Sequence, residues 1–202
     1  MESSNIKEIA DKYNRIAGNY DTVDRFIPSR WRRRAAGLAC GRVLEVGIGT
    51  GLNFPFYADC CTEIVGIDIS SGMLEKAKER ASQCKAPVRL EIMDVQELPL
   101  AAESFDSVLA AFVFCTVPNP LQGLRECRRV LKPGGKLILL EHTGSGNGAL
   151  RQFMDWLNPF TVRFLGDHIN RDTGEVVAMA GFTVRSVNNL LGDVVRLVVA
   201  EK

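Results

Sequence analysis

The segment Arg42–Phe54 constrains the fold more than any other part of the chain. It reads RVLEVGIGTGLNF, in which an apolar stretch containing Val43, Leu44 and Val46 runs directly into three glycines at every second position. Glycine tolerates positive φ and lets a ligand approach the backbone closely. A strand that ends in such a loop and leads into a helix places backbone N–H groups at the carboxyl edge of a sheet, where open α/β sheets bind ligands. The segment therefore predicts a buried strand followed by a ligand cradle.

Segments with strand character and segments with helical character alternate along most of the chain. After residues 43–46, strands are expected at residues 64–67, 88–92, 105–114 and 136–142. Helices are expected at residues 5–20, 25–39, 71–84 and 120–131, with Ser70 as the N-cap of the third and residues 132–135 as a turn. This alternation predicts a doubly wound α/β fold with a mostly parallel sheet.

The C-terminal part of the chain breaks this alternation. Residues 181–202 give a strand, a loop and a second strand with no helix between them, which predicts a hairpin. We therefore expect a seven-stranded sheet that is mostly parallel, with an antiparallel last strand. Before the hairpin lies an insertion at residues 143–180, in which Asp172 and Glu175 have the spacing of a capping box that opens a last helix.

Length and composition narrow the class of protein. A chain of 202 residues suits a single domain, and its net charge of +1 gives no general argument for nucleic acid as a partner. None of the six cysteines forms a C-x-x-C pair, so we expect no metal site and reduced cysteines that serve packing. The N-terminus lacks an apolar signal region, and the longest apolar run, Val108–Cys115, is too short to span a bilayer. These features predict a cytoplasmic protein.

The acids at the ends of three predicted strands indicate what the cradle holds. The spacing G-x-G-x-G differs from the dinucleotide pattern G-x-G-x-x-G, and no Lys-Ser/Thr pair follows the loop as in a phosphate-binding loop. Glu45 stands just before the loop, Asp68 ends the second strand and Asp94 follows the third. A carboxylate at the position of Asp68 can accept both hydroxyls of a ribose. The three acids together favour a cationic nucleoside over an anionic one.

S-adenosylmethionine is such a nucleoside, and the motifs resemble those of the class I S-adenosylmethionine-dependent methyltransferases. VLEVGIGTG, GIDIS, MDVQELP, SFDSVLAAFVF and RVLKPGGKL match the successive motifs of that group over residues 40–142. The resemblance is to the type 11, ubiquinone-biosynthesis-like branch, and it implies a Rossmann-like methyltransferase fold that converts the cofactor to S-adenosylhomocysteine. It also implies one domain with a helical N-terminal cap (1–39), a cofactor-binding core (40–142), a substrate cap (143–180) and the hairpin (181–202).

The same resemblance assigns cofactor contacts position by position. The methionine part would be held by Glu45, Gly47, Gly49 and Gly51, the ribose by Asp68, and the adenine by Ile69, Met73, Asp94 and Val95, while Phe112 would line the sulfonium side. Each residue type also has an ordinary structural role that stays open. Gly51 could serve helix–sheet packing, Met73 and Phe112 could be core residues, Asp68 could cap the next helix, and Asp94 could be a turn residue.

Two residues are candidates for the chemistry at the acceptor. His142 is expected to end the fifth strand at the ligand-binding edge, where it could act as a general base, contact a head group or have a structural role. Tyr20 matches a tyrosine of the N-terminal segment that folds over the cofactor in the quinone and bacterial phospholipid branches. Tyr13 is a weaker match, and His168 is expected to be structural.

The segment SRWRRR at residues 29–34 has two interpretations. It could be a solvated helix face, or Arg30, Trp31, Arg32, Arg33 and Arg34 could contact anionic lipid on the inner face of a membrane. The insertion is rich in large apolar residues that could line an acceptor pocket or pack a helix on the sheet; they are Leu150, Phe153, Met154, Trp156, Leu157, Phe160 and Phe164. The sequence gives no indication of the oligomeric state.

The acceptor is predicted from two further resemblances. GRVLEVGIGTGLNFPFY is similar to bacterial phosphatidylethanolamine N-methyltransferases, and HINRDTGEVVAMAGF is similar to the thiol methyltransferases of the methyltransferase-like group. We therefore expect methylation of a small apolar or lipid-associated acceptor: first a phosphatidylethanolamine-type amine, then a lipophilic thiol, then the ring carbon of a quinone precursor. A non-catalytic scaffold that binds S-adenosylmethionine is the alternative. A nucleic-acid substrate is not expected, because FVFCTVPNP stands where Asn/Asp-Pro-Pro-Tyr would be.

Overall fold

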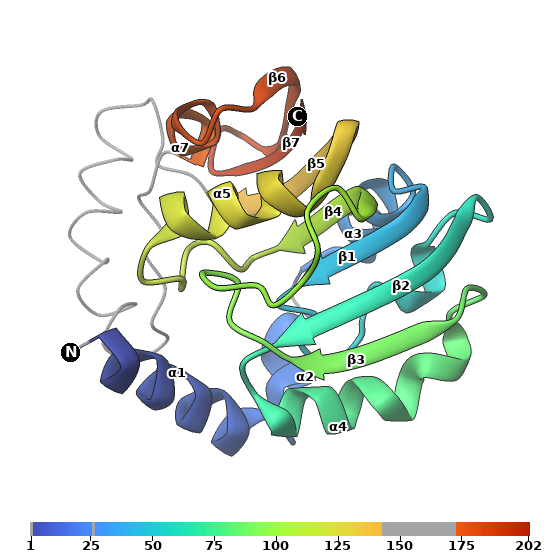
Figure 1. Cartoon of the computed structure of the whole chain (residues 1–202). Coiled ribbons are helices and arrows are strands. Elements are labelled where there is room, and N and C mark those ends of the chain that lie inside the picture. Colours follow the sequence, from blue (N-terminus) through green and yellow to red (C-terminus); the bar gives the residue numbers. More distant parts are fainter. Residues whose placement is uncertain (1, 26, 143–172) are drawn as a thin grey trace.

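The computed structural model describes residues 2–25, 27–142 and 173–202 and shows a seven-stranded sheet with helices on both faces (Figure 1). The strand order is β3-β2-β1-β4-β5-β7-β6. The strands are β1 (Gly41–Val46), β2 (Cys61–Asp68), β3 (Val88–Ile92), β4 (Phe105–Ala111), β5 (Leu131–His142), β6 (Thr183–Leu191) and β7 (Val195–Glu201). Strands β1 to β5 pair in parallel, whereas β7 runs antiparallel to β5 and β6. The predicted fold class and the C-terminal hairpin are therefore confirmed.

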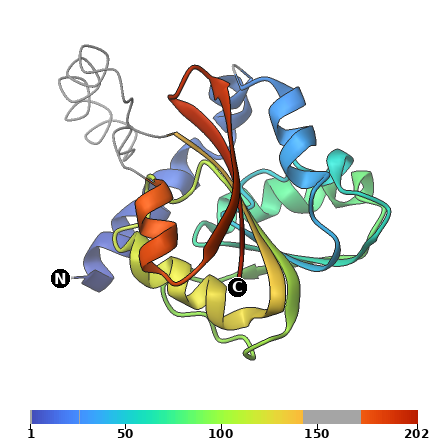
Figure 2. The same cartoon turned by 90° about the horizontal axis from the view of Figure 1, so that it is seen from above.

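The helices divide between the two faces of the sheet (Figure 2). They are α1 (Glu2–Ile16), α2 (Tyr20–Asp24), α3 (Ser29–Ala36), α4 (Ser71–Arg80), α5 (Pro120–Val130) and α7 (Thr173–Met179), with short 3₁₀ turns η1 (Phe54–Phe56) and η2 (Ala81–Gln83). Helices α3 and α4 cover one face, and α5 and α7 cover the other. Because side chains alternate along a strand, Val43 of β1 packs under α3 and α4 while Leu44 and Val46 pack under α5.

The predicted cap of α4 is present. The backbone N–H of Met73 donates to Ser70 Oγ at 3.1 Å, which satisfies one of the free amides of the first turn. The pairing fixes where α4 begins and therefore how its first turn meets the end of β2.

Several boundaries differ from the sequence prediction. The first predicted helix is divided into α1 and α2 around Gly18, and α3 begins only at Ser29 because Pro28 is extended (φ −60°, ψ 126°). Strand β4 ends at Ala111, because Phe112 has a φ of 60° and leaves the sheet. Residues 132–135 lie within β5, across a register irregularity opposite Phe105 and Ser107, instead of forming a separate turn.

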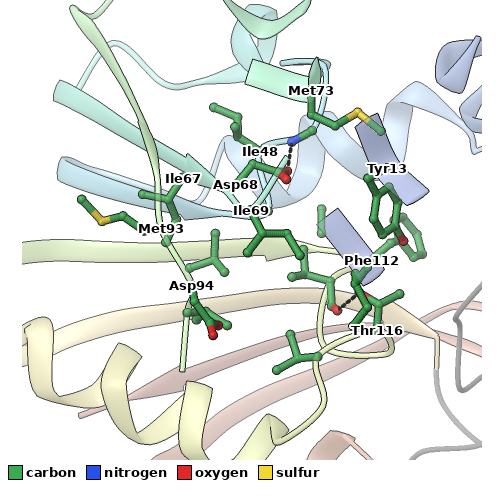
Figure 3. A pocket seen from close by; sticks show the side chains of 18 of the residues that line it. Tyr13, Ile48, Ile67, Asp68, Ile69, Met73, Met93, Asp94, Phe112 and Thr116 are labelled. Carbon is green, nitrogen blue, oxygen red and sulfur yellow. Dashed lines mark hydrogen bonds between the residues drawn. The ribbon is translucent and has the colours of Figure 1, made fainter. Parts of the chain in front are cut away.

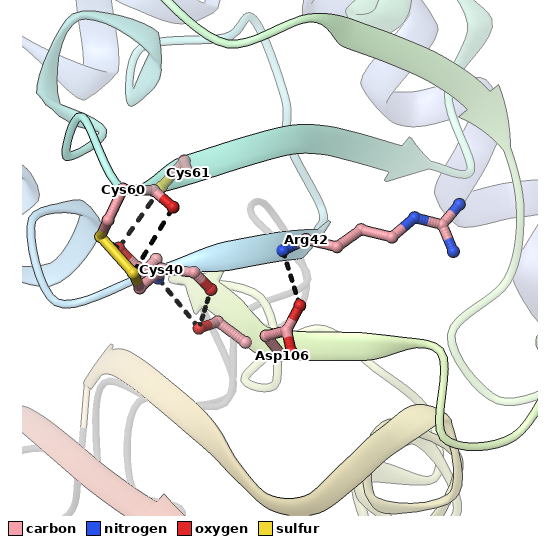
Figure 4. Close-up of a disulfide and its surroundings, with 7 residues drawn as sticks. Cys40, Arg42, Cys60, Cys61 and Asp106 are labelled. Atoms are coloured by element: carbon pink, nitrogen blue, oxygen red, sulfur yellow. Dashed lines mark hydrogen bonds between the residues drawn. A yellow bond between two sulfur atoms is a disulfide. The ribbon is translucent and has the colours of Figure 1, made fainter.

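The expectation that all cysteines are reduced is wrong for one pair. A disulfide joins Cys40 and Cys60, whose Cα atoms are 5.1 Å apart (Figure 4). The two residues are 20 positions apart in sequence but meet because β1 and β2 start side by side, with Gly41 opposite Cys61. The bond lies at the amino edge of the sheet, at the opposite ends of the strands from the glycine loop.

Several sequence predictions lie outside the described residues. These are the apolar residues of the insertion between Leu150 and Phe164, together with His168 and Asp172. In the part of the chain that is described, no helix has the length and apolar character needed to cross a membrane.

Candidate active site

The glycine loop after β1 brings the backbone to the floor of an open pocket. Gly47, Gly49 and Gly51 all have positive φ, at 60°, 56° and 80°. A Cβ on Gly49 would meet no atom within 4 Å, whereas one on Gly51 would lie 2.4 Å from the Phe54 ring. Gly49 therefore faces free space that a ligand can fill, and Gly51 is required for packing beneath η1.

The pocket lies at the carboxyl ends of β1, β2, β3 and β4, and its open space, mouth included, measures about 930 Å³ (Figure 3). Most of the residues predicted from sequence line it: Tyr20, Gly47, Gly49, Asp68, Ile69, Met73, Asp94, Val95 and Phe112. Tyr13, the weaker candidate, lines it as well. Glu45, Gly51 and His142 are not among the described residues that line it.

Asp68 projects from the end of β2 toward the glycine loop. Its Oδ2 accepts from the Gly49 N–H at 3.0 Å, and its Oδ1 accepts from the Ser70 N–H at 2.9 Å. Burial raises the pKa of Asp68 to about 6, against the opposing effect of these amides. One of these donors belongs to the glycine loop and the other to Ser70, the N-cap residue of α4. Together they hold the Asp68 carboxylate at the pocket. Each carboxylate oxygen keeps a lone pair for a further donor such as a ribose hydroxyl.

Glu45 is not among the described residues that line the pocket, but it contacts Asn53, which is, so its role toward the methionine part stays a prediction. The residue is only 1 % exposed, and its carboxylate accepts from Asn53 Nδ2 at 2.6 Å and from the Tyr57 hydroxyl at 2.5 Å. Burial raises the pKa of Glu45 to about 7. Strand alternation explains this placement: the Glu45 side chain points to the face of the sheet that η1 covers, where Asn53 and Tyr57 meet it.

The far end of the pocket is formed by the turn after β3. Asp94 Oδ1 accepts from the Gln96 N–H at 2.9 Å, so its carboxylate shapes the turn. Asp94 and Gln96 both line the pocket, and Gln96 Oε1 accepts from the Asn119 N–H at 2.8 Å. Asp94 is thus a turn residue and a wall residue at once, so its two sequence interpretations are compatible.

The N-terminal segment closes the pocket from the side of α4. Asn14 Oδ1 in α1 accepts from the Ser70 hydroxyl at 2.7 Å and from the Gly72 N–H at 2.9 Å. Asp21 in α2 accepts from the Thr50 hydroxyl at 2.6 Å and pairs with Arg80. Neither contact was predicted from the sequence, although Asp21 directly follows the candidate site residue Tyr20.

Tyr20 is held in an environment that keeps its proton. Burial is the largest effect, the negative charge of Asp24 adds to it, and together they raise the pKa of the hydroxyl far above its usual value. The Tyr20 hydroxyl is therefore a hydrogen-bond donor at neutral pH and is not available as a phenolate. Its ring lies 6.1 Å from that of Tyr13, with an interplanar angle of 62°.

Phe112 marks the opposite wall and occupies an unusual backbone conformation. Its φ of 60° is rare for a residue with a side chain. The Phe112 N–H donates to the Leu140 carbonyl at 2.7 Å, and Glu141 Oε1 accepts from the N–H groups of Val113 and Phe114. The His142 ring packs on Phe112, with centroids 4.8 Å apart. His142 ends β5 at the carboxyl edge as predicted and lies beside Phe112, although it is not among the described residues that line the pocket, so its role stays a prediction.

The basic segment of α3 is divided between the core and the surface. Trp31 and Arg32 are 8 % and 9 % exposed, so the expectation that they contact a membrane is wrong. Arg32 pairs with Asp24 at 2.7 Å, whereas Arg30, Arg33 and Arg34 are exposed. The helical period accounts for this, since residues 31 and 35 share the buried side of α3.

These features fit S-adenosylmethionine. Gly49 leaves room against the backbone, Asp68 offers acceptors to a ribose, and the apolar Ile69 and Met73 lie beside it as a surface for adenine. Figure 3 shows Asp94 and Met93 at one end of the pocket and Tyr13 and Phe112 at the other, so an elongated nucleoside can lie along it. No cluster of His, Cys, Asp and Glu side chains that could hold a metal ion occurs in the described ranges.

Comparison with known proteins agrees with this geometry. The profile of a methyltransferase domain family matches residues 44–139. A phosphatidylethanolamine N-methyltransferase from Cereibacter sphaeroides is 40 % identical over 59 % of this chain and 60 % of its own length. A demethylmenaquinone methyltransferase from Renibacterium salmoninarum is 31 % identical over 94 % of this chain and 90 % of its own.

A solved structure gives the same fold over nearly the whole chain. It is an S-adenosylmethionine-dependent methyltransferase, described as a possible histamine N-methyltransferase, from Thermotoga maritima. The TM-score is 0.72 at 21 % identity, with 95 % of this chain and 99 % of the other covered. The strand order, the pocket and the match to relatives along 94 % of the chain lead to one conclusion. The chain belongs to the class I S-adenosylmethionine-dependent methyltransferases.

Proposed function

We propose that this methyltransferase acts on the amine of an apolar, lipid-type acceptor, with phosphatidylethanolamine as the first candidate. The observation that carries the proposal is the aromatic end of the pocket, where Tyr13, Tyr20 and Phe112 are all wall residues. Aromatic faces attract cations. An amine that gains methyl groups becomes a more persistent cation with each transfer, so this end of the pocket suits both the acceptor and its product.

The approach to the aromatic end is apolar, as a lipid acceptor requires. Ile6 and Ile9 of α1 and Val117 and Pro118 of the turn after β4 line the same pocket. Apolar walls favour acyl chains over hydrated groups, at about 0.8 kcal/mol per buried methylene. A soluble polar amine would gain nothing from them.

Bound S-adenosylmethionine supplies an electrophilic methyl group, and the residues of the chain position the acceptor nitrogen in line with it. In the proposed transfer, the nitrogen lone pair would form a bond to the methyl carbon while the bond from that carbon to sulfur would break. Positioning accounts for much of the rate of such a displacement. One proton leaves the amine for each transfer. We propose His142, next to Phe112, as its acceptor because an imidazole titrates near neutral pH, and Tyr20 as a neutral donor that orients the head group.

The comparisons support a lipid-type acceptor but leave its reacting atom open. One relative is named for an amine of a phospholipid, and it aligns over 60 % of its own length. Another is named for a menaquinone precursor and aligns over 94 % of this chain. Methylation of a quinone-precursor carbon is therefore the second candidate, while a lipophilic thiol and a non-catalytic binding protein are further outcomes of the test.

The exposed side of α3 supports a peripheral contact with the membrane that holds such an acceptor. Arg30, Arg33 and Arg34 point outward, and each basic side chain near an anionic surface contributes about 1 kcal/mol. We therefore propose that these three arginines, without the buried Trp31 and Arg32, form the contact. Binding to vesicles with and without anionic lipid tests it, with the triple Arg→Glu variant as the comparison.

The acceptor test uses methyl-labelled S-adenosylmethionine with three acceptors in separate reactions. These are phosphatidylethanolamine vesicles, a lipophilic thiol and a demethylated quinone, each followed by extraction of the organic phase. Label on the lipid amine is the expected result. Label on the quinone ring or the thiol alone would replace the proposed acceptor, and binding of the cofactor with no label in any acceptor would favour a binding protein. His142→Gln should then lower the rate of methyl transfer.

A further inference from the structure

The pocket wall contains one buried cation whose role the acceptor does not explain. Arg32 is the one Lys or Arg side chain among the described residues that line the pocket. It is 9 % exposed and lies on the buried side of α3. Removing a guanidinium from water costs free energy unless the charge is paired. The buried position of Arg32 therefore needs partners or a ligand to compensate for this cost.

The described contacts of Arg32 leave part of its hydrogen-bonding capacity available. Nη2 donates to both carboxylate oxygens of Asp24 at 2.7 Å, and Nη1 donates to Asn53 Oδ1 at 3.2 Å. A guanidinium has five N–H donors in a fixed plane. Asp24 and Asn53 use at most three of them, so these partners fix the plane while at least two donors remain.

The location of Arg32 matches one end of the cofactor. Its guanidinium lies 5.8 Å from the Phe112 ring at the end of β4, and Asn53 follows the glycine loop of β1. Asp68 and Asp94, which suit the ribose and the adenine, end β2 and follow β3. S-adenosylmethionine carries its amino-acid group at the end remote from the adenine. That group contains the single anionic function of the ligand, the carboxylate.

We infer that Arg32 recognises the methionine carboxylate of the cofactor and that Asp24 holds Arg32 in position for it. Asp24 belongs to α2 and Arg32 to α3, so the same guanidinium would join the N-terminal segment to the bound cofactor. This inference rests on the use of S-adenosylmethionine and not on the identity of the acceptor. Failure of the acceptor proposal would therefore leave it unaffected.

The experiment compares two ligands that differ only in this carboxylate. Calorimetry measures the affinity of the protein for S-adenosylmethionine and for decarboxylated S-adenosylmethionine. The wild-type protein should prefer the first by roughly 10- to 100-fold, the usual value of a charge-assisted hydrogen-bonded pair. In Arg32→Met the preference should fall to below about threefold, while the affinity for 5′-methylthioadenosine, which lacks the amino-acid group, stays unchanged.

Two matched variants separate recognition from folding. Arg33→Met changes the exposed neighbour and should keep the full preference. Because Arg32→Met leaves the Asp24 carboxylate buried without its partner, the double variant Asp24→Asn/Arg32→Met provides the same test without that charge. Asp24→Asn alone should reduce the preference only in part, because the asparagine oxygen can still accept a hydrogen bond from Arg32.

Two results would overturn the inference. Equal weakening of both ligands in Arg32→Met and in the double variant would mean that Arg32 only fastens the N-terminal segment. An unchanged affinity for S-adenosylmethionine together with a raised KM for a phospholipid would assign Arg32 to the phosphate of the acceptor instead.

Discussion

The two edges of the sheet use the same residue types in opposite ways. At the carboxyl edge, Asp68 is held by backbone N–H groups beside an open pocket. At the amino edge, Asp106 pairs with Lys132 at 2.7 Å and accepts from the Arg42 N–H at 2.8 Å, close to the Cys40–Cys60 disulfide (Figure 4). One edge presents carboxylates to a ligand, and the other uses them to tie strands together.

The electrostatic consequence is a difference in the sign of the pKa shifts. Burial raises the pKa of Asp68 to about 6 and that of Glu45 to about 7. At the other edge, the hydrogen bond from Lys132 holds the pKa of Asp106 below its usual value. Asp68 is held by backbone N–H groups rather than by a cation, so a sulfonium ligand can supply a nearby positive charge. Acids at the amino edge already have one.

The largest effect is expected when a side chain is added at the glycine loop. Gly49→Val should weaken S-adenosylmethionine binding by more than about 100-fold, because the new side chain would occupy the space that the ligand needs. The matched control is Gly134→Val near the amino edge, where φ is also positive and a Cβ also meets nothing within 4 Å. Both variants carry a similar backbone strain of about 1–2 kcal/mol. Thermal unfolding should show equal destabilisation of the two variants, whereas calorimetry should show weakened S-adenosylmethionine binding only in Gly49→Val. Equal binding by both variants would refute the role of the glycine loop as a ligand cradle.

The pH dependence of stability should differ in sign between Glu45 and an acid that is paired with a cation. The pKa of Glu45 is raised in the folded protein, so its contribution to stability is full below about pH 4.5 and is lost as the pH rises through about 7. Glu45→Gln should therefore gain stability relative to the wild type over this window, by on the order of 2–3 kcal/mol.

The matched control for that measurement is Glu126→Gln. The hydrogen bond from Arg129 lowers the pKa of Glu126, so its contribution is present above about pH 4.5 and is lost as the pH falls through the lower folded value. Denaturant unfolding at several pH values measures both variants. A Glu45→Gln difference that is flat from pH 5 to 7.5 would show that Glu45 is already ionised at pH 5.

Replacing Asp68 or Asp106 by alanine tests the comparison between the two edges of the sheet at single residues. Asp68→Ala should weaken S-adenosylmethionine binding roughly tenfold or more, since hydrogen bonds to a charged group are worth about 1.5–3 kcal/mol. Asp106→Ala should leave binding unchanged and lower the free energy of unfolding by up to about 1 kcal/mol, as its side chain is 39 % exposed. Unchanged affinity in Asp68→Ala would remove this residue from the ribose site.

The smallest effect is expected at Tyr20. Because burial keeps its hydroxyl protonated, Tyr20→Phe should lower kcat by less than about tenfold and should leave the pH profile between pH 6 and 9 unchanged. Steady-state rates across that range measure both quantities. Loss of a basic limb in the variant would mean that the Tyr20 hydroxyl does transfer a proton.

Much of the fold could be predicted because its determinants act over short stretches. The alternation of strands and helices, the Ser70 cap and the C-terminal hairpin are confirmed, and each depends on periodicity or capping within a few residues. The exceptions are boundaries where a single backbone angle decides, as at Phe112. No residue pattern near Phe112 signals its positive φ, since the Glu141 carboxylate that holds the following amides lies on another strand.

The features of the candidate site also fall into two groups, those that local sequence determines and those that tertiary contacts determine. The sequence by itself determined the glycine loop and the pocket positions of Asp68 and Asp94, because the carboxyl ends of parallel strands must meet at one edge. The pocket position of Phe112 was expected only from the resemblance to known methyltransferases. Only the tertiary structure decided that Glu45 is buried and that Arg32, alone in its basic segment, lines the pocket among the described residues. The disulfide between Cys40 and Cys60 belongs to this second group. The physical reason is common to all three: Glu45 contacts η1, Arg32 contacts α2 and Cys40 meets Cys60 at the start of the next strand, so each depends on how separate elements pack and not on local propensity.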